Sequence, residues 1–200
     1  MEAPDVRFST RELRDLLLAW LALGLAFALF YERVSPPRLP AVLTSRAFAV
    51  AMGVSLVTVG VGFLLHELAH KVVAVRYGQY AEFRADYGFL ALAVIGGLAG
   101  FIFAAPGAVF HRGSLTKAQH GHIALAGPLT NLGLAVLFVP LFFLSPLIAT
   151  RGVEINLLLA GFNMLPIGGL DGRTVLDWST PIYLVVTIPS VLLAASIFLF

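Results

Sequence analysis

A long uncharged stretch, from Ala47 to Leu65, sets the first limit on how this chain can fold. A helix needs about 20 apolar residues to cross the hydrocarbon core of a bilayer, and this stretch approaches that length. It runs directly into the segment His66–His70, which reads HELAH. Two imidazoles and a carboxylate thus lie where we expect the edge of the membrane. Ionisable groups at that depth are costly enough to suggest a functional site.

The composition extends the membrane prediction to the whole chain. Hydrophobic residues make up 59% of the 200 residues and charged residues only 12%, whereas a soluble domain has about 25% charged residues. The mean hydropathy is +0.92. We therefore expect a multi-pass protein of the cell membrane, surrounded by lipid, with room for five or six crossings of about 20 residues each.

Two further features of the composition exclude whole classes of function. The chain contains no cysteine, so disulfides, thiolate zinc ligands and cysteine nucleophiles are excluded. Any bound metal must therefore be held by His, Asp or Glu. The net charge is only +2 and the basic residues are scattered, which argues against a nucleic-acid partner.

Six apolar stretches follow one another along the chain, and we expect a single integral membrane domain over residues 1–200. We predict an all-α polytopic fold with five to six transmembrane helices. The first and last stretches lie outside the core that carries the motifs, about residues 61–172, and are expected to be peripheral helices. The stretches cover residues 13–31, 41–65, 87–110, 123–149, 153–167 and 181–200.

The fifth stretch ends in a predicted helix break. Pro166 has no backbone N–H, so the carbonyl of Phe162 loses its helical partner. The chain then passes through glycines and presents Asp171. A helix that is broken at membrane depth needs a cavity lined by protein or water to satisfy its backbone, and a hydrolytic site needs such a cavity too.

The HELAH segment has the spacing of a zinc site. His66 and His70 are four residues apart and share one face of a helix, and Glu67 beside them can act as the base for a water molecule. A hydrolytic zinc site has three protein ligands and one open position. Asp171 is the leading candidate for the third ligand because it follows a helix break. The other candidates are His111, His120, His122, Glu82, Asp86 and Asp177.

Three motifs together resemble the site-2 protease family of intramembrane zinc metalloproteases. Residues 63–70 match FxxHExxH, residues 163–172 match NxxPxxxLDG, and residues 127–131 match GPxxN. The resemblance covers about residues 61–172. We expect a minimal member of prokaryotic or archaeal type, without a PDZ or CBS domain.

The resemblance implies a role for each residue of the site. His66, His70 and Asp171 would bind one Zn²⁺ per chain, and Glu67 would be the general base. Asn163 would contact the backbone or the developing oxyanion of the substrate. The implied activity is regulated intramembrane proteolysis, the hydrolysis of peptide bonds in transmembrane helices of membrane-protein substrates by zinc-activated water.

The remaining polar residues of the motif-bearing core are given structural interpretations. We expect Gly127 and Pro128 to start or kink a helix. We expect Asn131 to hydrogen-bond between helices. Solvated loop positions are expected for His111, His120 and His122.

A shared zinc site also restricts the topology. Asp171 must lie at the same membrane depth as His66 and His70, so the chain must cross an even number of times between them. One of the three intervening apolar stretches therefore cannot be a full crossing. The stretch 87–110 contains several glycines and Pro106, so we predict a re-entrant or β-like loop at about residues 80–110.

The basic residues predict which way the protein faces. With the N-terminus and residues 71–122 inside, nine of the 13 Lys and Arg residues are cytoplasmic, in the sense of the positive-inside rule. The site then lies toward the cytoplasmic side. The sequence leaves the oligomeric state open.

Two other functions fit parts of the pattern. A membrane protein that binds or transports a metal without proteolysis could use the same ligands, but it would not need Glu67. Membrane metalloproteases of the prenyl-protein or heat-shock type resemble HExxH enzymes whose third ligand is a downstream Glu. This chain contains no EExxx motif to supply such a ligand.

Overall fold

The structure, a computed structural model, describes residues 5–33, 36–102 and 106–197. Most of these residues are helical. Short 3₁₀ segments cover Pro36–Arg38 and Val139–Phe143, and a π-helical turn, Leu56–Gly60, joins α3 to α4. The remaining elements are α1 Thr10–Tyr31, α2 Leu39–Leu43, α3 Arg46–Ser55, α4 Val61–Arg76, β1 Tyr80–Ala85, α5 Tyr87–Ala99, β2 Gly107–Arg112, α6 Lys117–Phe138, α7 Pro146–Asn163, α8 Asp171–Trp178 and α9 Thr180–Ser196.

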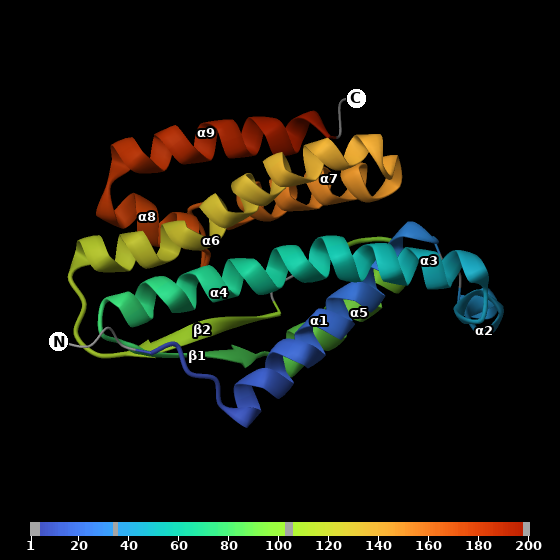
Figure 1. The fold of residues 1–200 in the computed structure, drawn as a ribbon, viewed down its shortest axis with the longest axis horizontal. Helices are drawn as coiled ribbons and strands as arrows, with labels where there is room; N and C mark the ends of the chain where they lie inside the picture. The colour runs from blue at the N-terminus through green and yellow to red at the C-terminus, as the bar shows by residue number, and fades with distance from the viewer. Residues whose placement is uncertain (1–4, 34–35, 103–105, 198–200) are drawn as a thin grey trace.

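Helix α4 lies in the middle of the molecule (Figure 1). The two strands, α1 and α5 lie on one side of it, and α6, α7 and α9 are layered on the other side. The HELAH segment of α4 is therefore enclosed between the small sheet and α6.

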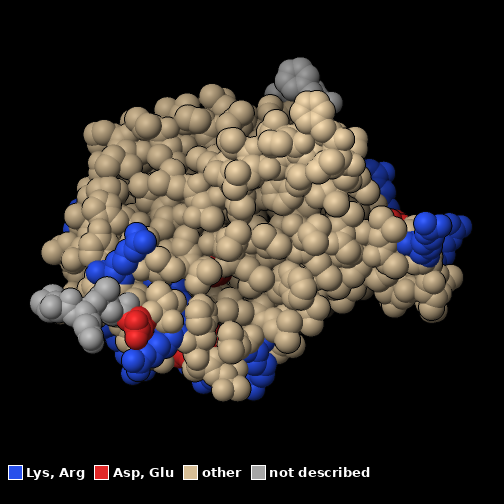
Figure 2. Space-filling model, viewed as in Figure 1, with Lys and Arg blue, Asp and Glu red and all other residues tan. Residues whose placement is uncertain are grey.

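Within the part of the chain that the structure describes, three helical segments are long and apolar enough to cross a membrane. They are Thr10–Tyr31, Arg46–Arg76 and Lys117–Phe143, and the second joins α3, the π turn and α4 into one helix. The apolar helices α5 and α9 are shorter. On the face shown in Figure 2, Lys and Arg gather toward two ends, with a broad uncharged surface between them. This distribution is compatible with a membrane protein, whereas five to six crossings stay a prediction.

The segment predicted as a re-entrant or β-like loop forms two antiparallel strands with helix α5 between them. Tyr80 pairs with Arg112 at one end of the sheet, and Ala85 pairs with Gly107 at the other. The chain therefore enters and leaves this segment at the same end of the molecule. The two strands agree with the β-like alternative of the prediction, and the other described residues are mostly helical. Part of the predicted loop, residues 103–105, lies outside the described residues.

Two carboxylates of α1 hold the outer edge of strand β1. Glu12 Oε1 accepts the N–H of Phe83 at 3.0 Å, and Asp15 Oδ2 accepts the N–H of Ala85 at 3.3 Å. Both carboxylates are buried, and they satisfy backbone groups on an edge that no further strand of the described residues covers. These contacts join residues that are 70 or more positions apart, so no local pattern in the sequence predicts them.

A buried ion pair holds α4 against α1 next to the HELAH segment. The Lys71 ammonium donates to Glu12 Oε2 and to the carbonyl oxygen of Arg7, and it lies 3.9 Å from the centroid of the Phe8 ring. Both charged side chains are buried. Because Lys71 directly follows His70, the pair anchors the turn of α4 that carries the imidazoles.

Candidate metal centre

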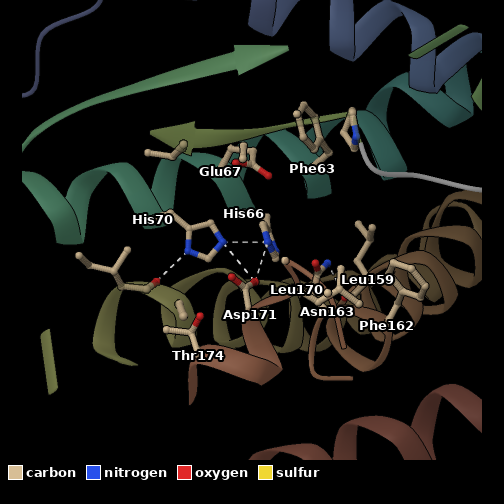
Figure 3. Close-up of a pocket in the computed structure, with 18 of the residues that line it drawn as sticks. Phe63, His66, Glu67, His70, Leu159, Phe162, Asn163, Leu170, Asp171 and Thr174 are labelled. Atoms are coloured by element: carbon tan, nitrogen blue, oxygen red, sulfur yellow. Dashed lines mark hydrogen bonds and ion pairs between the residues drawn. The ribbon is translucent and has the colours of Figure 1, made fainter. Parts of the chain in front are cut away.

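Helix α4 presents His66 and His70 on the face that turns toward α6 (Figure 3). Their four-residue spacing places one imidazole a turn above the other. The two Nε2 atoms lie 2.9 Å apart, and both side chains are buried. The structure thus brings the two predicted ligands together on one face.

Asp171 reaches the same point from the break after α7. The Leu170 N–H donates to the Ile167 carbonyl at 3.2 Å, and Gly168 between them adopts a φ of +57° that suits glycine. This turn starts α8 with the Asp171 carboxylate facing the two imidazoles (Figure 3). Its Oδ2 lies 3.3 Å from Nε2 of His66 and 3.3 Å from Nε2 of His70.

The three side chains form a compact set of possible metal ligands. One donor atom from each of His66, His70 and Asp171 lies within 4.8 Å of the others. Among residues 5–33, 36–102 and 106–197, no other three His, Asp or Glu residues meet in this way. The alternative third ligands named from the sequence are therefore not brought to the two imidazoles.

Hydrogen bonds on the far side of each ring fix which nitrogen faces Asp171. His66 Nδ1 lies 2.6 Å from Asn131 Oδ1, and His70 Nδ1 lies 2.7 Å from the Ile123 carbonyl oxygen. Both partners can only accept, so each Nδ1 carries the proton and donates it. In the neutral rings each Nε2 then holds a lone pair, which is the form of histidine that binds a metal.

The Nε2 lone pairs of His66 and His70 and the Asp171 carboxylate form a site that suits a cation. Two Nε2 lone pairs meet at 2.9 Å, and Asp171 Oδ2 is buried without a hydrogen-bond partner among the described residues. An ionised carboxylate is costly to bury unless an opposite charge lies next to it. A metal cation held by His66, His70 and Asp171 would provide that charge.

The dimensions of the site suit Zn²⁺. Tetrahedral ligands about 2.0–2.1 Å from Zn²⁺ lie about 3.3 Å from one another, which agrees with the two carboxylate distances of 3.3 Å. Gly127 of α6 leaves the necessary space. A Cβ on Gly127 would lie 2.4 Å from His70 Nε2 and 2.5 Å from His66 Nε2, where the ligands converge.

Comparisons with known proteins agree with this chemistry. A candidate zinc metalloprotease of the archaeon Methanocaldococcus jannaschii is 42% identical over 191 residues, which are 92% of this chain and 92% of that protein. The chain belongs to this family of zinc metalloproteases. A second protein of the same archaeon, named a zinc metalloprotease, is 32% identical over 123 residues, or 58% of this chain and 31% of its own length. No family model and no solved structure matches the chain.

In this zinc metalloprotease the ligand set opens into a cavity of about 680 Å³. Glu67 is buried and lines the cavity beside the imidazoles (Figure 3). Asn163 lines it from α7, with its Nδ2 donating to the Leu159 carbonyl at 2.9 Å. The roles of Glu67 and Asn163 stay predictions, and the structure brings both to the cavity that holds the three possible ligands.

The other three histidines are not in loops, contrary to the sequence prediction. His111 lies on β2 and His120 on α6, and both line the cavity. Burial, together with the neighbouring His120, lowers the pKa of His111. His122 lies outside the cavity lining, and its Nδ1 is 2.6 Å from the Tyr77 hydroxyl. Their sequence context is polar, but the capping box at Thr116 starts α6 early and makes two of them helical.

The sequence prediction missed that Asn131 lies next to the possible metal ligands. It was expected only to join helices, and it does so, because its Nδ2 donates to the Gly62 carbonyl at 3.1 Å and to Asn156 Oδ1 at 2.9 Å. Its Oδ1 also accepts from His66, as described above. The spacing of the GPxxN motif offered a signal, since Gly127 and Asn131 are four residues apart and share a helix face.

Proposed function

We propose that this metalloprotease is an intramembrane zinc endopeptidase of the site-2 protease type. It would hydrolyse peptide bonds within transmembrane helices of other membrane proteins. The observation that carries the proposal is the convergence of His66, His70 and Asp171 beside Glu67 in one cavity. Apolar helices that are long enough to cross a membrane contribute to that cavity on two sides.

His66, His70 and Asp171 would hold the ion, and Glu67 would handle the proton. When bound, Zn²⁺ supplies Lewis-acid activation of a water molecule and of the scissile carbonyl. The Glu67 carboxylate takes a proton from the attacking water and passes it to the leaving amine. Asn163 contacts the backbone or the developing oxyanion of the substrate at the wall of the cavity.

The strand β2 offers a place for an extended substrate segment. A transmembrane helix satisfies its own backbone hydrogen bonds, so it must unwind locally before a peptide bond can reach the ligands. In the two-stranded sheet β2 pairs with β1 on one edge, and Gly107, Val109 and His111 line the cavity. Addition of the unwound segment along β2 would replace its lost helical hydrogen bonds.

The substitution Glu67→Gln separates this proposal from a metal carrier. A protease should keep about one Zn²⁺ per chain and lose about 10²- to 10⁴-fold in cleavage rate, the usual contribution of a general base. A carrier should keep both metal binding and metal transfer. Zinc content and cleavage of a single-helix membrane substrate are measured in the same proteoliposomes. Cleavage at the wild-type rate by Glu67→Gln would refute the proposed mechanism.

A further inference from the structure

Asn156 is a polar side chain that the proposed chemistry does not use. It lies in the middle of α7 and is fully buried, with 0% exposure. Its Nδ2 donates to the Gly152 carbonyl at 2.8 Å, and its Oδ1 accepts from Asn131 Nδ2 at 2.9 Å. A buried amide costs free energy unless it is hydrogen-bonded, so its partners show what it does.

The partners of Asn131 determine which end of its amide faces His66. An Asn side chain can present either its oxygen or its NH₂ group, and only the oxygen can accept from an imidazole N–H. The two N–H bonds of Asn131 Nδ2 point to two acceptors, the Gly62 carbonyl at 3.1 Å and Asn156 Oδ1 at 2.9 Å. Asn156 supplies the shorter of these two contacts and thereby turns the oxygen toward His66.

Gly62 leaves room for the contact between Asn156 and Asn131. A Cβ on Gly62 of α4 would lie 2.8 Å from Asn156 Oδ1. Gly62 therefore lets the Asn156 side chain from α7 approach α4 and Asn131 of α6 together. Three helices meet at this point, one turn before His66 on α4.

We propose that Asn156 is a positioning residue which, through Asn131, holds His66 in the tautomer that binds zinc. The proposal rests on the proposed function, since it concerns a ligand of the same zinc site. Without Asn156, the Asn131 amide can rotate and direct an N–H at His66 Nδ1. The ring then favours the tautomer with its proton on Nε2, and that nitrogen no longer binds a metal.

The test measures zinc affinity rather than cleavage. Full-length protein is purified in detergent and stripped of metal, and Zn²⁺ binding is measured by competition with a chromophoric chelator. Asn156→Ser keeps a hydroxyl that can bond to the Gly152 carbonyl but is too short to reach Asn131. We expect it to bind Zn²⁺ about 10- to 100-fold more weakly, as when other outer partners of metal ligands are removed. Asn156→Asp keeps the acceptor and should bind more tightly than Asn156→Ser.

Two controls separate positioning from general stability. Ser190→Ala removes a buried hydroxyl that bonds only within α9, to the Val186 carbonyl at 2.7 Å, and should leave zinc affinity unchanged. If Asn156 acts through Asn131, the double variant Asn131→Ala/Asn156→Ser should bind no more weakly than Asn131→Ala alone. Thermal unfolding of each variant shows that the folded protein is being measured.

Three results would overturn the proposal. Wild-type affinity in Asn156→Ser would show that the contact does not matter for zinc, and losses that multiply in the double variant would show that Asn156 acts independently of Asn131. If His66→Ala binds Zn²⁺ as tightly as the wild type, the proposed zinc site itself is wrong, and the role of Asn156 is overturned with it. The last result is distinguishable because it appears without any change at position 156.

Discussion

At the scale of single residues, the candidate centre depends as much on the absence of a side chain as on the three ligands. Gly127 lies opposite both imidazoles, and any Cβ there would come within 2.5 Å of them. The sequence suggested only that this glycine shapes a helix. Its closeness to His66 and His70 depends on how α6 packs on α4, which no local pattern in the chain contains.

We predict that Gly127→Ala abolishes zinc binding while the protein stays folded. The methyl group would occupy space where the ligands converge, so zinc affinity should fall by more than the roughly 10- to 100-fold that changes in outer partners cause. Metal content after dialysis gives the readout. Gly133→Ala is the matched control, because a Cβ on this glycine of the same helix meets nothing within 4 Å. Equal zinc content in the two variants would contradict the assignment.

At the scale of elements, the sequence predicted the helix that carries His66 and His70 and the break that presents Asp171. Both are local, since a four-residue spacing and a Pro-Ile-Gly-Gly segment act within a few residues. The strand–helix–strand segment is different. Its apolar, glycine-rich residues suit a helix or an extended chain equally, and the strand before them is held by contacts with Glu12 and Asp15 of the distant α1.

The ion pair between Lys71 and Glu12 links α4 to α1. We predict that removing one of its two charges destabilises the protein. Lys71→Met leaves the Glu12 carboxylate buried and unpaired, which should lower the free energy of unfolding by about 3–5 kcal/mol. The double variant Lys71→Met/Glu12→Gln should recover part of this loss because no lone charge remains. Unfolding in a denaturing detergent measures the difference.

The exposed pair of Arg173 and Asp177, 3.2 Å apart on α8, provides the control for this prediction. Asp177→Asn should change stability by less than about 1 kcal/mol, as expected of a solvated ion pair. A loss in Lys71→Met as small as the loss in Asp177→Asn would show that the buried pair does not anchor α4.

At the scale of the whole molecule, the site restricts how the chain lies in a membrane. The Tyr77 hydroxyl lies 2.6 Å from His122 Nδ1, so the end of α4 and the start of α6 lie at the same end of the molecule. The positive-inside rule predicts that this end faces the cytoplasm. The sequence could predict this shared end from the need for one zinc site, but it could not predict the depth of the helices.

We predict that single cysteines at positions 76 and 117 are labelled from the cytoplasmic side and a cysteine at position 38 from the other side. Arg76, Lys117 and Arg38 are all exposed. The chain has no cysteine of its own, so each reporter is read alone. A membrane-impermeant maleimide added to intact cells or to inverted vesicles gives the readout. Labelling of positions 76 and 117 from opposite faces would contradict the fold.

Intramembrane cleavage by Glu67 and the three-ligand centre is the central claim, and the position of the cut bond tests it most directly. The purified protein is placed in liposomes with a single-helix substrate, and the products are identified by mass spectrometry. We expect the wild type to cut a bond inside the apolar segment of the substrate. The resulting products should be absent with Glu67→Gln and after chelation of zinc. Cleavage confined to the soluble flanks of the substrate, or cleavage that survives Glu67→Gln, would contradict the account.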